Sequence, residues 1–508
     1  MTDSRVTWAA CGLAAAAVAI GVGEIVAALM GGQSIIASVG ALVISLQPPG
    51  AKDLMVALFG ENDKLALEVA VAIGGILVGG LLGLLARRNR QFGIAGFVVF
   101  GGVAFLLLQR DPLAGMLESA ISASSAVLAG VGVLYWLSAS LNRPMAPVES
   151  GAAEPARAPV GMGRRGFLAL AGTFVAVGGV LAIVGRYLGS FMAPVAGPGV
   201  QIPTPTGTNF AIAGLTPIVV PNDVFYRIDT RLDVPEVDAE TWRLRVHGMV
   251  DQEVTLTYAD LQQMAMEERF VTIACVSNEV GGRLVGNALW TGVRLTSVLE
   301  SAGVKPEATQ LVGRSFDGWT AGFPTAHLAG AGKDALIALS MNREPLPAAH
   351  GFPARLIVPG LYGYVSATKW ITEIELTTLE AFDAYWVPLG WSKQAPILTQ
   401  SRIDLPRRSG RVPAGQVEVA GVAWAPTRGI SRVEVLLDGV EPWRQAELSV
   451  PLSTAAWVQW RVVVDAAAGA HTLEVRATDG TGETQTSDRT PPAPDGARGY
   501  HGISFAAE

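Results

Sequence analysis

The chain of 508 residues has a formal net charge of −7, which gives no sign of nucleic-acid binding. A mean hydropathy of +0.38 and a hydrophobic content of 50% are high for a soluble chain of this length. The two cysteines, Cys11 and Cys275, are too few for a cysteine-rich zinc site, and Cys11 lies in an apolar run, which excludes an intrachain disulfide in the polar part of the chain.

Apolar stretches are concentrated in the first 190 residues. Five of them are long enough to cross a bilayer, so we predict a five-helix transmembrane bundle over residues 1–189. A shorter run, Ile35–Leu46, is followed by a pair of prolines and is interpreted as a re-entrant or interfacial piece. The predicted spans cover residues 7–30, 69–86, 92–108, 116–141 and 167–188.

Ionisable residues are rare inside these spans. No histidine precedes His247, which excludes a haem held by paired imidazoles within the bundle. Glu24 lies deep in the first span. An intramembrane carboxylate is usually functional or paired within the bundle, and we favour a role in helix packing or partner contact over a proton route, because no companion chain of acids or histidines is visible.

The connections between the spans differ in charge. Two of them are rich in arginine: Arg87, Arg88, Arg90, and then Arg143, Arg157, Arg164, Arg165. The others carry both signs: Lys52, Asp53, Glu61, Asp63, Lys64, and then Arg110, Asp111, Glu118. The positive-inside rule therefore predicts a cytoplasmic N-terminus, and five crossings deliver residues 190–508 to the extracytoplasmic side of the cell membrane.

A pair of arginines, Arg164 and Arg165, stands directly before the fifth span. The pair and the moderately apolar helix after it resemble the twin-arginine signal, which exports proteins that have already folded around a cofactor. The alternative is a plain topology anchor.

Beyond the spans the chain becomes polar and is punctuated by proline and glycine. Residues 190–215 are predicted as a linker. Residues 216–398 mix short strands with short helices, a pattern typical of an α+β domain. The strands are expected at residues 241–248, 270–276, 310–314, 335–340, 354–359 and 370–376, and the helices at 256–264 and 293–302.

Residues 399–508 are predicted as a separate all-β domain. Alternating strands recur at roughly regular spacing and are separated by turn sequences, which favours an immunoglobulin-like sandwich. The expected strands cover residues 417–424, 430–439, 458–464 and 471–480.

Cys275 lies at the end of a predicted buried strand, residues 270–276, which is followed by the polar, glycine-rich sequence Ser277–Gly282. A thiolate is a soft donor, so a single cysteine suits a metal whose remaining ligands come from elsewhere. The alternative is an inert core cysteine, since free cysteine is among the most buried residue types.

Several separate segments between Asp223 and Leu376 resemble the sulfite oxidase family of molybdenum enzymes in order and spacing. They are Asp223–Arg227, Trp242–Val250, Ala274–Asn278, Leu289–Leu295, Leu339–Pro347, His350–Gly363 and Thr368–Trp370. The resemblance implies a pterin-dithiolene cofactor on molybdenum with one cysteine thiolate as the sole protein ligand. Cys275 stands at that position.

The same resemblance assigns further residues. Arg227, which also belongs to the implied catalytic set with Cys275, matches a basic cofactor contact of the family. So do His350, Arg355 and Lys369, although each could instead be a solvated surface charge. Neutral hydrogen bonds to the cofactor are expected from Tyr226, Asn278 and Ser366, and Tyr385 falls near the active-site tyrosine of the family.

The chain departs from the family at two places. Glu279 and Val280 stand where sulfite oxidases carry arginines that help to bind the anionic substrate, and Asp229 replaces a histidine two residues after Arg227. A carboxylate near a doubly charged anion is repulsive. The departures therefore weaken the case for sulfite as the substrate.

The sequence thus predicts a membrane-bound molybdenum enzyme that transfers an oxygen atom to or from a small oxyanion or S- or N-oxide, which is a two-electron oxidation or reduction of that substrate. Electrons would pass to or from an external carrier, either a cytochrome or the quinone pool. The C-terminal domain resembles a dimerisation domain, which implies a homodimer. The alternatives are a reductase of sulfoxides or N-oxides at the same site and, in another class, a cofactor-free adhesion or signalling ectodomain.

Overall fold

The computed structural model describes residues 4–47, 55, 58–59, 62–111, 114–141, 163–192 and 202–508. Contacts divide the chain into two compact units, residues 1–195 with 231–234, and residues 196–230 with 235–508. The charged residues Lys52, Asp53, Glu61, Arg143 and Arg157, and residues 193–201 of the predicted linker, lie outside the described residues.

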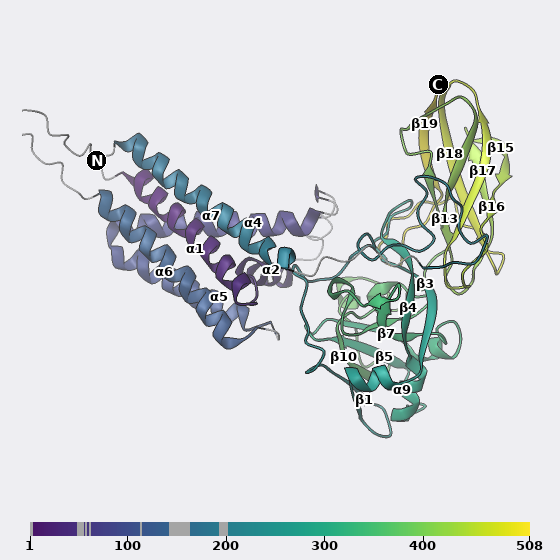
Figure 1. The fold of residues 1–508 in the computed structure, drawn as a ribbon, viewed down its shortest axis with the longest axis horizontal. Helices are drawn as coiled ribbons and strands as arrows, with labels where there is room; N and C mark the ends of the chain where they lie inside the picture. The colour runs from purple at the N-terminus through teal and green to yellow at the C-terminus, as the bar shows by residue number, and fades with distance from the viewer. Residues whose placement is uncertain are drawn as a thin grey trace, which may run out of the picture. The chain divides into compact units, whose positions relative to one another are not determined.

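The N-terminal unit is a helical bundle (Figure 1). Its long helices are α1 (Arg5–Leu29), α4 (Asp63–Arg88), α5 (Arg90–Leu108), α6 (Met116–Leu141) and α7 (Arg164–Met192). Each contains a stretch long and apolar enough to cross a membrane, which agrees with the five predicted spans. The short apolar run forms a twelve-residue helix, α2 (Ile35–Leu46).

Helix α1 packs against α4, α6 and α7. Small residues bring these helices close together: a Cβ added to Gly12 would overlap the backbone of Gly79 and Gly83 on α4. Such contacts between small residues are typical of helix pairs in membranes, where close backbone approach replaces the hydrophobic driving force.

Glu24 is 2% exposed, and its carboxylate accepts a hydrogen bond of 2.9 Å from the backbone N–H of Ile36. Ile36 lies in the first turn of α2, where the backbone N–H groups have no partner within the helix and the helix dipole favours negative charge. The contact supports the helix-packing interpretation of Glu24.

Residues Arg231–Val234 belong to the helical unit although they lie beyond it in sequence. Arg231 forms an ion pair of 2.7 Å with Asp111, which follows α5. The carbonyl of Leu232 accepts a hydrogen bond of 2.8 Å from Arg186 of α7, and its side chain packs against Gly40 of α2. No local feature of the sequence predicts this docking, because it depends on partners far away in the chain.

The second unit begins with two sheets. One has the order β2-β1-β10-β5-β6, in which β1 (Arg243–Gly248) and β10 (Ile371–Thr377) are parallel. Its other strands are β2 (Val254–Thr257), β5 (Gln310–Ser315) and β6 (Thr320–Pro324). The other sheet has the order β3-β4-β7-β8, with β9 paired to β7. Its strands are β3 (Met266–Ala274), β4 (Val285–Arg294), β7 (Leu336–Met341), β8 (Glu344–Pro345) and β9 (Arg355–Ile357).

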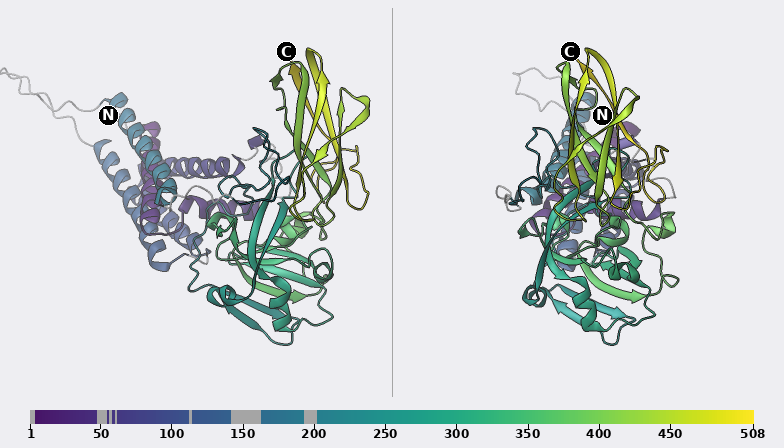
Figure 2. Two further views of the ribbon diagram at one scale, coloured as in Figure 1. Left: turned by 45° about the vertical axis from the view of Figure 1, so that its right-hand side comes forward. Right: turned by 90° about the vertical axis from the view of Figure 1, so that its right-hand side faces the viewer.

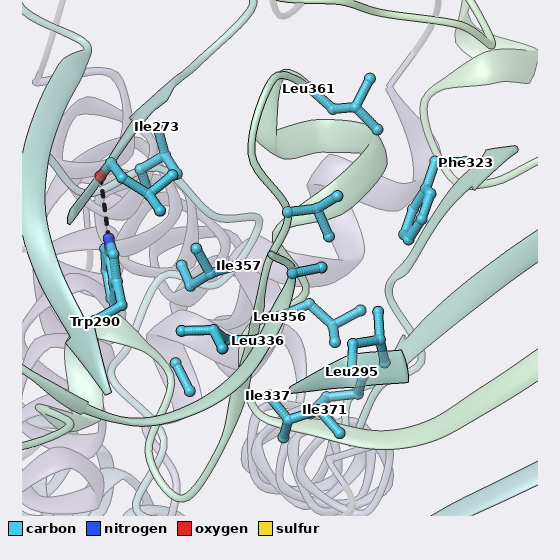
Figure 3. Close-up of a cluster of buried hydrophobic side chains, with 14 of the residues drawn as sticks. Ile273, Trp290, Leu295, Phe323, Leu336, Ile337, Leu356, Ile357, Leu361 and Ile371 are labelled. Atoms are coloured by element: carbon cyan, nitrogen blue, oxygen red, sulfur yellow. Dashed lines mark hydrogen bonds between the residues drawn. The ribbon is translucent and has the colours of Figure 1, made fainter. Parts of the chain in front are cut away.

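Apolar side chains from both sheets and from helix α9 (Leu295–Ala302) share one core. Figure 3 shows Trp290 of β4, Leu356 of β9 and Ile371 of β10 among its members, and the indole N–H of Trp290 donates to the carbonyl of Val271 at 3.2 Å. The second predicted helix is α8 (Tyr258–Gln263), which Thr257 and Asp260 cap reciprocally. Short strands mixed with short helices confirm the predicted α+β class.

The predicted set lacked β2, β6 and β8, and it also lacked the long strand β4. Its sequence, Val-Gly-Asn-Ala-Leu-Trp-Thr-Gly-Val-Arg, interrupts the apolar alternation with glycine and asparagine. The strand forms because it pairs along its length with β3 and also with β7, so it is buried on both edges. For the same reason the helix expected from residue 293 begins two residues later, after β4 ends at Arg294.

The C-terminal strands form two further sheets, drawn in green to yellow in Figures 1 and 2. One has the order β11-β13-β17-β16 and the other β12-β19-β18-β14-β15. The four predicted strands are β13 (Gly415–Trp424), β14 (Ile430–Leu437), β17 (Val458–Ala466) and β18 (Gly469–Asp479). The prediction missed β11 (Gln400–Leu405), β12 (Arg411–Val412), β15 (Val440–Gln445), β16 (Glu447–Leu448) and β19 (His501–Ala507). Apolar residues of the two sheets share one core, which confirms an all-β C-terminal region.

Within the second unit, buried hydrogen bonds join the α+β domain to the C-terminal all-β region. The hydroxyl of Thr272 on β3 accepts from the backbone N–H of Trp457 at 2.8 Å, and the indole N–H of Trp457 donates to the carbonyl of Ile218 at 2.8 Å. Residues 202–215 of the predicted linker also pack here: Phe210 donates its backbone N–H to the side chain of Gln459. Residues 202–215 are therefore held by the C-terminal strands, whereas residues 190–192 of the predicted linker belong to helix α7.

Candidate active site

Cys275 lies at the first position of a hairpin loop. Strands β3 and β4 pair up to Ala274 and Val285, and the backbone N–H of Cys275 donates to the carbonyl of Leu284 at 2.9 Å. The loop therefore runs from Cys275 to Leu284. Cys275 is 9% exposed and carries a thiol, as does Cys11 in the bundle.

Asn278 organises this loop. Its backbone N–H donates to the carbonyl of Cys275 at 3.1 Å, and its side-chain Oδ1 accepts from the backbone N–H of Leu284 at 2.8 Å. The side chain thus closes the loop from within. A cofactor contact by Asn278 stays a prediction.

Two tyrosines interact electrostatically with Cys275. Burial raises the pKa of Tyr226 above its ordinary value, and the negative charge of a Cys275 thiolate raises it further. Burial likewise raises the pKa of Tyr362 to about 12, with Cys275 again contributing. Both phenols therefore keep their protons at neutral pH and can donate hydrogen bonds. The sequence analysis missed Tyr362, although Tyr362 lies in one of the segments that carry the resemblance.

Arg355 is buried, and no residue in the described part of the chain forms an ion pair with it. Arg355 is the first residue of β9 and is 3% exposed. Its guanidinium carbon lies 5.0 Å from the centroid of the Trp290 ring. One guanidinium N–H donates to the carbonyl of His350 at 3.0 Å, while Nε has no hydrogen-bond partner among the described residues. Burial lowers the pKa of Arg355 to about 10, because no carboxylate offsets the loss of solvation. The site therefore offers an unused donor and an uncompensated positive charge.

His350 is 4% exposed and offers an acceptor. Its Nε2–H donates to the carbonyl of Asn222 at 2.9 Å, which leaves Nδ1 with a lone pair and no partner among the described residues. Burial lowers the pKa of His350 to about 3, and the charges of Lys369 and Arg355 add to the effect. The imidazole is therefore neutral at physiological pH and fits a ligand that carries an N–H donor.

Asp229 joins the two other basic residues of the predicted set. Its carboxylate accepts from Nε of Arg227 at 2.9 Å and from Nζ of Lys369 at 2.9 Å. Burial lowers the pKa of Lys369 to about 8, while Asp229 acts in the opposite direction. The departure from the family pattern at Asp229 thus places a shared carboxylate between Arg227 and Lys369.

Two predicted residues have their own local partners. Ser366, 1% exposed, donates its hydroxyl to the carbonyls of Leu361 and Tyr362. The backbone N–H of Tyr385 donates to the hydroxyl of Thr320, and burial followed by the charge of Asp317 raises the pKa of the Tyr385 phenol. Their roles at the cofactor stay predictions.

The donor set suits a cofactor that combines a soft metal with an anionic group. No group of three or more His, Cys, Asp or Glu side chains that could hold a metal occurs among the described residues, so a metal at Cys275 would take most of its ligands from the cofactor. The cations Arg227, Lys369 and Arg355 and the carboxylate of Asp229 together leave a net charge of +2 to balance a phosphate group. The orphaned Nε of Arg355 and Nδ1 of His350 supply a free donor and a free acceptor.

Comparisons with known proteins are consistent with this chemistry. Residues 231–386 match the family described as oxidoreductase molybdopterin binding domain, and residues 394–491 match the Mo-co oxidoreductase dimerisation domain. The uncharacterized oxidoreductase YuiH of Bacillus subtilis is 35% identical over 160 residues, which cover 31% of this chain and 77% of that protein.

Mitochondrial sulfite oxidases are also similar. The protein of Rattus norvegicus is 29% identical over 290 residues, covering 48% of this chain and 52% of the relative. That of Homo sapiens is 29% identical over 303 residues, covering 51% and 55%. The chain thus spans about half the length of these curated relatives.

The low pKa of His350 predicts acid lability of the cofactor-free protein. Its folded pKa, about 3, lies below the ordinary value of 6.5, so its contribution to stability is complete above pH 6.5 and is lost as the pH falls toward 3. The shift corresponds to roughly 5 kcal/mol. The difference in thermal midpoint between the wild type and His350→Gln, measured on full-length protein in detergent, should shrink between pH 7 and pH 4.

His471 provides the control, because backbone and side-chain hydrogen bonds to Ala467 and Asp438 raise its pKa. The difference between the wild type and His471→Gln should therefore shrink as the pH rises through the raised pKa. If the difference in thermal midpoint between the wild type and His350→Gln stays constant from pH 7 to pH 4, the buried imidazole is not held neutral as inferred.

Proposed function

We propose a function from one premise: the chain belongs to the sulfite oxidase family of molybdopterin oxidoreductases. It is therefore an oxidoreductase with a molybdenum–molybdopterin cofactor. The proposed function is two-electron oxygen-atom transfer to or from a small substrate, by an enzyme bound to the cell membrane with its active site on the extracytoplasmic side. The observation that carries the proposal is the buried thiol of Cys275 with two protonated phenols near it and an uncompensated Arg355 among the basic groups of the site.

The residues of this chain are proposed to have the following roles in binding the cofactor. Cys275 supplies the thiolate for the metal, and Arg355 and Lys369 bind the anionic group of the cofactor. His350 accepts a hydrogen bond from the cofactor at Nδ1, and Asn278 holds the loop that carries the thiol. When bound, the cofactor supplies oxygen-atom transfer at its metal.

Substrate binding falls to the remaining polar side chains. Tyr226 and Tyr362 stay protonated because their pKa values are raised, so both can donate a hydrogen bond to a substrate oxygen. Arg227 and Tyr385 are proposed to complete the catalytic set, and Ser366 to add a hydrogen bond to the cofactor.

Membrane attachment is proposed from the helical unit. Leu77, Leu106 and Leu128 are 61%, 65% and 73% exposed on the candidate spans, which would be costly in water and is expected in lipid. The charge difference between the connections supports an extracytoplasmic catalytic part. Because the transfer involves two electrons, a carrier outside this chain, a cytochrome or the quinone pool, must accept or deliver them.

The C-terminal strands are proposed to form an immunoglobulin-like dimerisation domain. The match of residues 394–491 to a family described as a dimerisation domain and the shared core of the two sheets support this assignment. A homodimer through residues 399–508 is the assembly that we expect.

A specific observation favours a second candidate, a reductase of neutral S- or N-oxides. The carboxylate of Asp229 pairs with Arg227 and Lys369, and the exposed Glu279 adds a negative charge in the cysteine loop. After the cofactor phosphate is balanced, little positive charge remains for a doubly charged substrate such as sulfite. A neutral oxide needs only hydrogen-bond donors, which the two tyrosines provide.

Cys275→Ser tests the assignment of the metal ligand. An alkoxide is a much poorer soft donor than a thiolate, so the variant should lose turnover while the protein still folds. Dye-linked activity across sulfite, sulfoxides and N-oxides, metal analysis and the thermal midpoint are the measurements. Cys11→Ser, which changes the thiol in the bundle, should retain activity; full activity of Cys275→Ser would refute the assignment.

Sulfite kinetics test the charge argument. The native enzyme should oxidise sulfite with kcat/KM below ~10⁶ M⁻¹s⁻¹. Glu279→Arg should lower KM for sulfite by about tenfold, since reversing a charge close to a dianion changes binding by more than a kcal/mol. Asp229→His should act in the same direction by releasing Arg227. Efficient sulfite oxidation by the native enzyme would disprove the argument.

Export can be tested at the paired arginines. Replacing Arg164 and Arg165 with lysines preserves the charge that sets the topology but removes a twin-arginine signal. Protease accessibility of residues 202–508 in intact cells or spheroplasts should then be lost. Lysines at Arg87 and Arg88 are the matched control and should leave accessibility unchanged. Normal exposure of the Arg164/Arg165 variant would identify the pair as a topology anchor only.

A further inference from the structure

The tip of the cysteine loop is held by a residue of the C-terminal strands. Arg402 on β11 donates from one terminal nitrogen to the carbonyl of Gly282 at 2.9 Å. Its Nε donates to Asp404 at 2.7 Å, and its other terminal nitrogen donates to the hydroxyl of Thr216 at 2.8 Å. The Arg402 side chain is 8% exposed, so its planar guanidinium is largely shielded from solvent while these three hydrogen bonds fix its orientation.

A second residue of the same strands contacts the tip. His501 on β19 is 7% exposed, and its Nδ1 accepts from the backbone N–H of Ile403 at 2.9 Å. The ring lies directly against Gly281, which has a positive φ of +80°, and a Cβ added to Gly281 would overlap the imidazole. Gly281 therefore needs to be glycine for its backbone angle and for the approach of His501.

These contacts continue back to the thiol. Gly282 donates its backbone N–H to the carbonyl of Glu279 at 2.8 Å, and Asn278 binds both Cys275 and Leu284. The loop from Cys275 to Leu284 is thus closed by its own hydrogen bonds and held at its tip by Arg402 and His501. Each restraint acts on backbone whose position decides where the sulfur points.

We propose that Arg402 and His501 are positioning residues that hold the Cys275 loop in the geometry required for metal ligation. The proposal rests on the proposed function of Cys275 and deepens it. It gives the C-terminal domain a role beyond dimerisation, because the cysteine loop is incomplete without strands β11 and β19. Removing a residue that orients a metal ligand typically lowers metal affinity or activity by ~10–100-fold.

The experiment measures the thiol in the absence of the cofactor. Full-length protein is produced without molybdopterin in a Cys11→Ala background, so that Cys275 is the one cysteine in the chain. We expect Arg402→Met to increase the rate of alkylation of Cys275 by iodoacetamide by about tenfold, and Arg402→Lys to stay close to the parent, because lysine still donates one hydrogen bond and pairs with Asp404. His501→Ala, which leaves the Arg402–Asp404 pair intact, should also increase the rate.

Loaded protein supplies the second readout. Arg402→Met and His501→Ala should lower molybdenum retention and kcat and shift the sulfur-to-metal charge-transfer absorption, with KM little changed. Arg444→Gln, an exposed arginine of β15 paired at 3.9 Å with Asp465, is the matched control and should change neither readout.

The outcomes separate the two claims. Parent-like alkylation rates in folded Arg402→Met and His501→Ala would overturn the positioning role while leaving Cys275 as a ligand. Faster alkylation without any change in the charge-transfer band would also overturn it, since the loop would then move without affecting the metal. Retention of molybdenum and turnover by Cys275→Ser would instead refute the proposed function itself.

Discussion

Arg355 carries a positive charge in the interior of the catalytic part, and its surroundings are arranged around that charge. Moving such a group out of water costs several kcal/mol unless a partner compensates. The contacts present are the face of Trp290 and one carbonyl, which are weaker than a carboxylate. The charge also depresses the pKa of neighbouring His350 and Lys369. A protein that keeps this arrangement gains stability from an anionic ligand, so cofactor binding and folding are linked.

Asp229 divides the basic groups into two kinds. Arg227 and Lys369 share its carboxylate, which halves the positive charge of the pair, whereas Arg355 is not paired with it. The charge of Arg355 then suits an anionic group of the cofactor, and the shared carboxylate is the basis on which a substrate without a double negative charge is proposed. One difference from the family pattern thereby changes the electrostatics of the site.

The hairpin loop from Cys275 to Leu284 belongs to the α+β domain and contacts the C-terminal strands. Strands β3 and β4 present the loop, and residues of β11 and β19 hold its tip. The buried bonds among Thr272, Trp457 and Ile218 keep the same two parts in register. A mutation in the C-terminal strands can therefore act on the thiol through the backbone of the loop. In the helical unit, Arg231–Val234 plays a comparable part, because a short segment distant in sequence completes the packing of the bundle.

The sequence by itself determined the features that depend on local composition. Hydropathy over 17 or more residues located the five candidate spans, alternation and capping located most strands and the helices α8 and α9 of the α+β domain, and the spacing of the family segments located Cys275, Arg355 and His350. Only the tertiary structure decided the features that join distant residues: the central strand β4, the sharing of Asp229 by Arg227 and Lys369, the approach of Tyr362 to Cys275, and the contacts of Arg402 and His501 with the loop. The physical reason is that a strand pairing, a hydrogen bond or an electrostatic contact that depends on residues far apart in the chain leaves no local pattern. Its partners become neighbours only when the whole chain has buried its core.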